Sequence, residues 1–206
     1  MSVNSNNTLD ILVGNIKKDL SHDILSICIN FNYVNVVVKT RSIQKTLLYL
    51  RDHEDYKFIQ LINLCGVDYL GKSKERFEVI YNLLSLEKNL RICVKIRVNN
   101  KDSVPTVVPL FSSAGWYERE TWDLFGINFE GHPDLRRILT DYGFEGHPLR
   151  KDFPLSGYVE PRYDEEKKEI VYGPVKLPQA YRNFDFLSPW ENFDRFVLPG
   201  DDKPNS

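Results

Sequence analysis

The sequence predicts an α+β protein, with a mixed or antiparallel sheet that carries its helices on one face and a long irregular C-terminal tail. Three observations support this class. Residues 24–98 contain five β-rich runs separated by turn residues, and segments with the apolar spacing of helices precede and interrupt these runs. Residues 154–206 are rich in proline and aromatic residues and have no regular period. Strands and helices that succeed one another in this order favour helices gathered on one face of the sheet.

The first expected helix spans residues 9–20, where apolar residues recur at helical spacing. Gly14 lies in the middle of this segment and lowers its helix propensity. Residues 24–30 and 33–39 then form two expected strands, joined by a short turn. The apolar positions of the helix are Leu9, Leu12, Val13, Ile16 and Leu20.

A second helix is expected after this pair of strands, with Ser42 as its N-cap and its end near residue 51. Three further β-rich runs follow at residues 58–69, 77–86 and 90–98. Hairpin-type turns rich in glycine, lysine and asparagine separate these runs. The order of elements is therefore a helix, two strands, a helix and three strands.

A loop marked by prolines at residues 104–109 leads into a third expected helix at 111–125. Trp116 and Trp122 make this helix apolar on more than one side, so its charged residues are confined to a narrow part of the helix surface. Two interpretations remain open: a solvated charged face, or a charge network held against a second protein surface. The charged residues concerned are Glu118, Arg119, Glu120 and Asp123.

A five-residue repeat follows the third helix. The string Phe-Glu-Gly-His-Pro occupies residues 129–133 and again 144–148, and a basic pair follows each copy. Each histidine lies between glycine and proline, which is typical of a rigid turn. The histidines are His132 and His147, and the basic pairs are Arg136-Arg137 and Arg150-Lys151.

The C-terminal segment contains seven of the eleven prolines and ten of the twenty-six aromatic residues from residue 153 onward. Proline excludes long helices and sheet ladders, but a free linker would not carry so many aromatic residues. The segment either folds back or, as we favour, runs extended across a partner, with an exposed turn at residues 164–169. The expected partner-binding residues are Tyr181, Phe184, Phe186 and Trp190.

This organisation predicts one globular unit and a tail. Residues 1–110 form the α+β domain, residues 111–153 add the helix and the double turn to the same unit, and residues 154–206 form the extended partner-binding tail. No apolar run approaches the roughly 20 residues that span a bilayer. The first ten residues resemble neither a secretory signal nor an import presequence, so we expect synthesis in the working compartment or a targeting segment already removed.

The net charge of −2 at pH 7 gives no basic field for nucleic acid or an anionic membrane. The three cysteines, Cys28, Cys65 and Cys93, lie in apolar, strand-like contexts and are expected to be buried, reduced thiols. They are too few for four-cysteine ligation of an iron–sulfur cluster. The charge and cysteine content therefore favour neither nucleic-acid binding nor cluster binding.

Catalysis by this chain alone is not expected. A stand-alone metal-dependent hydrolase built on His132 and His147 is the alternative, because nearby carboxylates complete a plausible ligand set for zinc. However, the histidines lack HxH or HExxH spacing. The sequence also contains no Gly-x-Ser-x-Gly, GxGxxG or Walker-type loop.

The charged helix and the repeats together resemble the 30 kDa subunit family of respiratory complex I, also called NADH dehydrogenase subunit 9. The resemblance covers roughly residues 61–190. Besides the leading pattern, residues 139–154 and 181–191 also resemble the family. Its leading pattern is Glu118-Arg119-Glu120, Asp123-Leu124-Phe125, His132, Arg136 and Ile138-Leu139.

The resemblance implies a non-catalytic core subunit of the peripheral arm of proton-pumping NADH:ubiquinone reductase. Such a subunit supports electron transfer by scaffolding the 49 kDa-type subunit, and it has no membrane span. NADH, FMN, iron–sulfur clusters and ubiquinone are then bound by other subunits, and this chain binds no cofactor or metal. The expected location is the matrix side of the mitochondrial inner membrane, or the cytoplasmic face of a bacterial plasma membrane.

Within such a subunit, we expect the acidic and basic residues of the helix to form ion pairs with the two basic pairs and so to fix the double turn. Breaking a buried pair of this kind costs about 3–5 kcal/mol. The sequence therefore predicts that Arg136→Ala impairs assembly, while complexes that do assemble keep near-normal turnover.

Overall fold

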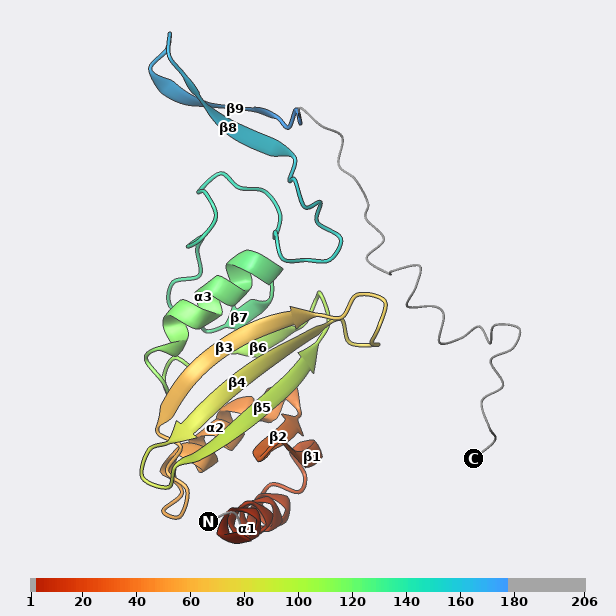
Figure 1. The fold of residues 1–206 in the computed structure, drawn as a ribbon, viewed down its shortest axis with the longest axis vertical. Helices are drawn as coiled ribbons and strands as arrows, with labels where there is room; N and C mark the ends of the chain where they lie inside the picture. The colour runs from red at the N-terminus through yellow and green to blue at the C-terminus, as the bar shows by residue number, and fades with distance from the viewer. Residues whose placement is uncertain (1–2, 178–206) are drawn as a thin grey trace, which may run out of the picture. The chain divides into compact units, whose positions relative to one another are not determined.

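The computed structural model describes residues 3–177 of the chain. The chain divides into two compact units, Met1–Gly157 and Tyr158–Ser206. The first unit contains a five-stranded sheet with its helices, and the described part of the second contains a two-stranded hairpin (Figure 1). The predicted α+β class with a mixed sheet is confirmed.

The central sheet has the strand order β1-β2-β5-β4-β3. All neighbouring strands are antiparallel except β2 and β5, which run parallel. Each of the five predicted strands is present within two residues of its expected bounds. The strands are β1 (Ile24–Asn30), β2 (Tyr33–Val38), β3 (Gln60–Asp68), β4 (Phe77–Ser85) and β5 (Leu90–Val98).

One face of this sheet forms the core. Side chains alternate along a strand and paired residues share a face, so the register aligns buried residues in rows across the sheet. In one such row Val36, Val94, Tyr81 and Leu64 follow one another from β2 to β3, each at most 1% exposed. The apolar sides of the helices belong to the same core cluster. The predicted placement of the helices on one face is therefore confirmed.

Two helices of this layer precede the third strand. Helix α1 (Val3–Asp19) begins earlier than predicted, and helix α2 (Ile43–Asp52) follows a short 3₁₀ turn. Ser42 occupies the predicted N-cap position of α2, but its hydroxyl donates to Asp23 Oδ1 at 2.7 Å instead of capping the helix. Among the described residues no helix is both long and apolar enough to cross a bilayer.

Helix α3 (Ala114–Phe125) packs closely against strand β3 (Figure 1). The contact is made over Gly66, where an added Cβ atom would lie 2.9 Å from Phe125 Cδ2 and 3.1 Å from Thr121 Cγ2. The absence of a side chain at Gly66 therefore allows the helix to approach the strand. This packing fixes α3, which carries the charged motif, to the rigid sheet.

The expected proline-marked loop at residues 104–109 is partly wrong. Ser103–Pro105 form strand β6, which pairs in parallel with strand β7 (Asn128–Glu130). Val104 and Phe129 face each other in this pair and are both buried. Non-local pairing with residues beyond α3 stabilises β6, and local sequence patterns do not report such pairing. The pair brings the first Gly-His-Pro turn beside the segment that enters α3.

The expected absence of strands after residue 153 is also wrong. Strand β8 (Val159–Asp164) pairs with strand β9 (Glu169–Pro174) in an antiparallel hairpin. The charged run at residues 164–169 forms its turn, as predicted. The four aromatic residues expected to bind a partner lie outside the described residues.

Candidate functional site

Helix α3 carries a buried glutamate on the side that faces the sheet. Glu118 is fully buried, and Val107 N donates to its Oε1 at 2.6 Å while the Thr106 hydroxyl donates to its Oε2 at 2.5 Å. Burial raises the pKa of the Glu118 carboxyl, although both hydrogen bonds oppose the shift. Glu118 therefore anchors the segment after β6 to α3. The expected ion pair with a basic residue of the double turn is wrong, because the groups that bind this carboxylate are the Thr106 hydroxyl and the Val107 N–H.

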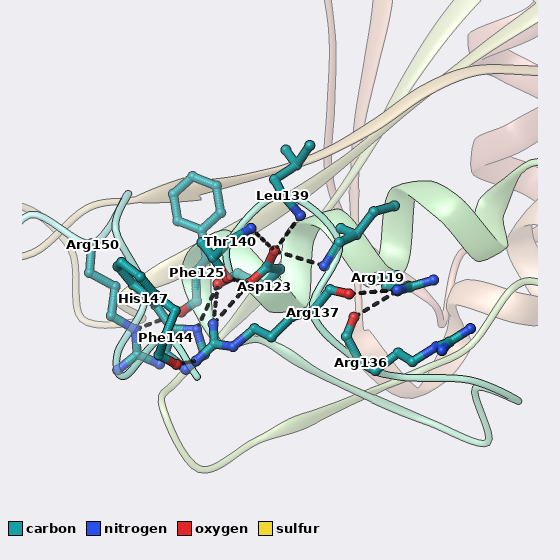
Figure 2. Close-up of polar contacts among 11 residues, drawn as sticks. Arg119, Asp123, Phe125, Arg136, Arg137, Leu139, Thr140, Phe144, His147 and Arg150 are labelled. Carbon is teal, nitrogen blue, oxygen red and sulfur yellow. Dashed lines mark hydrogen bonds and ion pairs between the residues drawn. The ribbon is translucent and has the colours of Figure 1, made fainter. Parts of the chain in front are cut away.

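The carboxylate of Asp123, near the C-terminal end of α3, is the centre of the site (Figure 2). It is fully buried, and one oxygen, Oδ2, accepts from three consecutive backbone N–H groups, of residues 138, 139 and 140, at 3.1, 2.8 and 3.0 Å. The other, Oδ1, accepts from the Thr140 hydroxyl at 2.6 Å and from Arg137 at 2.9 Å. We call Asp123, Arg137, Thr140 and His147 the Asp123 node.

The electrostatics of the node favour an ionised carboxylate. Burial alone would raise the pKa of Asp123, but hydrogen bonds from Thr140, Arg137 and the backbone hold it well below its usual range. The guanidinium of Arg137 also donates to the carbonyls of Asp123 and Phe144, at 3.1 and 2.9 Å. Its Cζ lies 5.3 Å from the centre of the Trp122 ring. One arginine thus joins the helix to both halves of the double turn.

The two Gly-His-Pro turns bind opposite ends of α3. His132 Nε2 lies 3.0 Å from the carbonyl of Gly115 in the first turn of the helix, and His147 Nδ1 lies 2.9 Å from that of Asp123 in the last turn. Because a carbonyl only accepts, each of these ring nitrogens is the donor. Burial lowers the pKa of His147, and the charges of Arg150 and Arg137 add to this effect. Each histidine therefore ties its turn to one end of α3 through a hydrogen bond to a helix carbonyl.

Arg119 and Arg136 occupy different environments. Arg119 donates to the carbonyls of Arg136 and Arg137 at 2.7 and 2.5 Å, so it binds the backbone of the basic pair. Arg136 pairs locally with Asp134, and its side chain is 65% exposed. The expectation that the Arg136 side chain locks the double turn is therefore wrong. Arg137 occupies that position, next to it in sequence.

The second basic pair binds the backbone and the sheet. Arg150 donates to the carbonyl of Phe125 at 2.6 Å, at the end of α3. The backbone N–H of Lys151 donates to Asp68 Oδ2 at 2.9 Å, at the end of β3. Neither side chain forms the ion pair with the acidic residues of α3 that the sequence predicts.

A buried carboxylate on the sheet, that of Asp68, supports this arrangement. The side chain of Asp68 is fully buried and forms a bidentate pair with Arg76, at 3.0 and 2.8 Å. Arg76 also binds Asp152 in the double turn, at 2.6 and 3.1 Å. Sequence reasoning missed this pair. The available signal was Asp68 itself, a carboxylate at an inward position of a strand whose neighbouring inward positions are apolar.

Glu120, the remaining acidic residue of the motif, is half-buried on α3. The expected burial of all three cysteines is wrong: Cys93 is buried and Cys65 half-buried, but Cys28 lies on the edge strand β1 and is exposed. The pKa of the Cys65 thiol on β3 is raised, first by burial and then by the charge of Glu120. Among residues 3–177, no group of three or more histidine, cysteine or acidic side chains is placed to hold a metal ion. The zinc ligands considered for a hydrolase, His132 and His147 with nearby carboxylates, are therefore not brought together in the described part of the chain.

The fold and the node define a class of protein: an α+β unit in which a charged helix is tied by internal bonds to an irregular double turn. Residues 36–159 match the family described as "Respiratory-chain NADH dehydrogenase, 30 Kd subunit". This match covers more than half of the chain and includes both turns. The chain belongs to this family, as its sequence motifs predict.

Similar proteins that are named as one subunit of NADH-quinone oxidoreductase support this assignment. The protein of Paramagnetospirillum magneticum is 54% identical over 191 residues, which cover 92% of this chain and 94% of the relative. The protein of Methylobacterium radiotolerans is 55% identical over 183 residues, covering 89% and 84%. The similarity thus extends over nearly the full length of both proteins.

Solved structures share the fold. The trypsin-resistant fragment (1-134) of Nqo5 matches with a TM-score of 0.53 and 32% identity, covering 62% of this chain and 98% of the fragment. A chain of the membrane-bound sulfane sulfur reductase, an archaeal respiratory membrane complex, matches with a TM-score of 0.62 and 25% identity. That match covers 80% of this chain and 99% of the other.

Proposed function

We propose that this chain is a non-catalytic core subunit of the peripheral arm of proton-pumping NADH:ubiquinone reductase, and that it scaffolds the 49 kDa-type subunit. One observation carries the proposal: the Asp123 carboxylate accepts five hydrogen bonds from its own chain. An ionised carboxylate offers about four lone-pair sites. Asp123 therefore has no capacity left for a substrate proton or a metal, and its chemistry is structural.

The surface that the node holds in place supports a scaffolding role. The irregular segment of residues 131–157 exposes large apolar side chains, and α3 adds the 68% exposed Trp116 beside the motif. Exposed apolar and aromatic residues on a firmly held backbone are typical of protein interfaces. The exposed residues of the segment are Leu139, Tyr142, Leu149 and Leu155.

The proposal assigns cofactors and location as well. NADH, FMN, iron–sulfur clusters and ubiquinone bind to other subunits, and this chain binds none of them. The names of the relatives support a role in NADH-dependent quinone reduction. We place the chain at the matrix side of a mitochondrial inner membrane or, in a bacterium, at the cytoplasmic face of the plasma membrane.

Co-purification tests the proposed function directly. A tagged copy of the chain is isolated from gently solubilised native membranes, its partners are identified, and NADH oxidation is assayed on the same fraction. We expect recovery in a large NADH-oxidising assembly that contains the 49 kDa-type subunit. Recovery as a small species without partners, carrying stoichiometric zinc, would instead support the metal-dependent hydrolase.

A pair of neighbouring substitutions tests the role of the node. Arg137→Ala removes the guanidinium that binds Asp123 and Phe144, and breaking such a buried pair costs about 3–5 kcal/mol. We expect a marked loss of assembled complex on native gels, with near-normal NADH oxidation per assembled complex. Arg136→Ala is the matched control and should assemble normally, because its side chain is exposed. Full assembly of Arg137→Ala with slow turnover would contradict the structural role.

A further inference from the structure

Strand β1 forms one outer edge of the central sheet. It pairs with β2, and within residues 3–177 no strand pairs with its other side (Figure 1). Such an edge presents unpaired N–H and C=O groups, and proteins usually protect it with lysine, proline or a bulge. The sequence of β1, Ile-Leu-Ser-Ile-Cys-Ile-Asn, contains no charged residue and no proline. Its bulge lies between Ile24 and Ser26, so the rest of the strand is a regular edge.

Apolar side chains at this edge are exposed to solvent. Leu25 and Ile29 are 60% and 36% exposed, and Phe31 in the turn that follows is 98% exposed. Short segments with high β propensity, no charge and no proline pair readily with further strands. An added strand would therefore satisfy the backbone groups of this edge and cover its apolar side chains.

The turn after β1 determines which backbone groups point outward. Its two residues, 31 and 32, both have positive φ, of 51° and 63°, so residues 30–33 form a two-residue hairpin of type I′. The residues that flank such a turn exchange both backbone hydrogen bonds, and hydrogen-bonded pairs then alternate along the strands. The backbone groups of Cys28 therefore point to β2, whereas those of Ile27 and Ile29 point to the outer edge.

A second copy of β1 fits this edge in an antiparallel register with Cys28 on the two-fold axis. Outward-pointing backbone groups must face one another, and this register sets Ile27 opposite Ile29 of the second copy, twice. Both outward-pointing residues of the regular part are then paired. The same register brings Leu25 toward Phe31 of the second copy, so exposed apolar side chains cover one another.

We propose that two copies of the isolated chain pair through their β1 edges, antiparallel about Cys28, and so join their sheets into one. Because β1 carries no charge, the two strands meet without like-charge repulsion. Any extended strand satisfies the backbone groups, whereas a second copy also matches the exposed side chains in the same register. Each copy uses its own β1 edge, which closes the assembly at two copies. The inference does not rest on the proposed function.

The Cys28 side chain, which is exposed, reports the register directly. In the proposed dimer the two Cys28 residues form a non-hydrogen-bonded pair with Cα atoms about 4.5 Å apart, a separation that a disulfide spans. Added diamide takes up two protons and two electrons from the facing thiols, so a disulfide-linked dimer should form. Mass spectrometry should assign the bond to Cys28 of both copies, and Cys28→Ser should remain a dimer without the cross-link.

Light scattering of the purified full chain over a range of concentrations tests the dimer itself. One strand pair is a small interface, so we expect a Kd of about tens of micromolar. Cys28→Lys sets two ammonium groups face to face on the axis and should raise Kd about tenfold or more. Gln60→Lys is the matched control, because it adds the same charge at an exposed position on β3, the opposite edge of the sheet. Its Kd should stay within about twofold of wild type.

The other outcomes overturn the inference in distinct ways. A wild-type chain that stays monomeric at about 1 mM would reject the dimer, and protection of Cys28 from maleimide in an assembled complex would then identify a strand of another subunit as the occupant. A dimer that persists in Cys28→Lys, with a wild-type circular dichroism spectrum, would place the contact elsewhere. Assemblies that keep growing with concentration would identify pairing between two different edges. Failure of the chain to co-purify with other subunits would reject the proposed function and leave these results unchanged.

Discussion

Glu118 and Asp123 lie on the same helix, are both fully buried, and have pKa values shifted in opposite directions. The donors around each carboxylate explain the difference. Glu118 receives two hydrogen bonds and, within the described residues, forms no ion pair, so burial prevails over these bonds and the charge of His132. Asp123 receives five hydrogen bonds, one of them from Arg137. Burial alone therefore does not determine the direction in which the pKa of an acid in this motif is shifted.

The raised pKa of Glu118 predicts a pH-dependent effect of Glu118→Gln. The folded state binds the proton more tightly than the unfolded chain, so wild-type stability falls as pH rises from about 4.5 through the folded pKa. Glutamine cannot ionise, yet it can still accept from Val107 N–H and donate to the Thr106 hydroxyl. Urea unfolding of the full chain should therefore show equal stability at low pH and a relative gain for the variant as pH rises.

Glu118→Ala is the companion variant. It leaves the Val107 N–H and the Thr106 hydroxyl without their buried acceptor, which costs about 1–3 kcal/mol for each unsatisfied group. This loss should persist across the same pH range. If Glu118→Gln destabilised the protein as much as Glu118→Ala at pH 8, an ionised Glu118 would be required for stability, and the direction of the pKa shift would be wrong.

At the residue scale, the sequence identified the charged motif but not most of its contacts. Charge spacing suggested ion pairs between side chains, and one of these, Asp123 with Arg137, is present. Most of the other donors and acceptors are backbone groups, such as the three N–H groups at Asp123 and the carbonyls bound by Arg119 and Arg150. Every residue carries these groups, so sequence patterns cannot distinguish which of them will be used.

At the scale of elements, the repeated Gly-His-Pro turns act as two ties on one helix. One binds the first turn of α3 through His132, and the other binds its last turn through His147. The C-terminal end of the helix, beside the contact with His147, is tightly packed. Gly126 caps α3 in a left-handed conformation, with φ of 71°, directly beside His147 and Arg150.

This geometry predicts that Gly126→Ala destabilises the protein. A non-glycine residue in the left-handed region costs about 1–2 kcal/mol. The added Cβ would also meet the His147 ring 2.5 Å away and contact the Arg150 guanidinium, so the total loss in unfolding free energy should exceed that figure. Thermal unfolding of the full chain measures the effect.

Gly143→Ala is the matched control, because it lies in the same double turn with no atom within 4 Å of the added Cβ. Its unfolding temperature should stay close to that of wild type. Equal, small effects of the two substitutions would show that the end of α3 relaxes freely, and the tie through His147 would then not hold the turn rigidly.

The strands also show what sequence patterns capture and what they miss. The five strands of the central sheet were predicted because their apolar residues alternate between turn signals. Apolar and charged residues also alternate along β8 of the hairpin, with Val159, Pro161 and Tyr163 on one face. Together with the residues opposite them on β9 they make six apolar positions, and prolines occupy two of these. The prediction that this segment contains no strand rests on its prolines, but an edge strand tolerates proline, and both strands of a two-stranded hairpin are edge strands.

At the scale of the whole molecule, the mixed sheet with helices on one face was predictable, but its strand order was not. The parallel pairing of β2 with β5 joins segments more than fifty residues apart, and no local pattern reports it. No local pattern reports the pairing of β6 with β7 either, and this pair positions the first Gly-His-Pro turn. The sequence thus predicted the elements and the class, while long-range packing decided how the motif was assembled.

The division into two units predicts how trypsin cleaves the chain. The unit that ends at Gly157 has a large buried core, whereas the described part of the other is a hairpin with exposed Arg162, Lys167 and Lys168. When cleavage follows local opening, a difference of about 1.4 kcal/mol in opening free energy gives a tenfold difference in rate. We expect the isolated full chain to be cut in the hairpin about tenfold or more faster than within the sheet.

The same digestion of the assembled complex shows whether a partner subunit covers the hairpin, whereas digestion of the isolated chain reports the stability of the hairpin itself. If another subunit covers the hairpin, mass spectrometry should show slower hairpin cleavage in the complex than in the isolated chain. Equal cleavage rates in the sheet and the hairpin of the isolated chain would contradict the marginal stability assigned to the hairpin. Equal hairpin cleavage in the free and assembled chain would mean that no partner protects the hairpin in the complex.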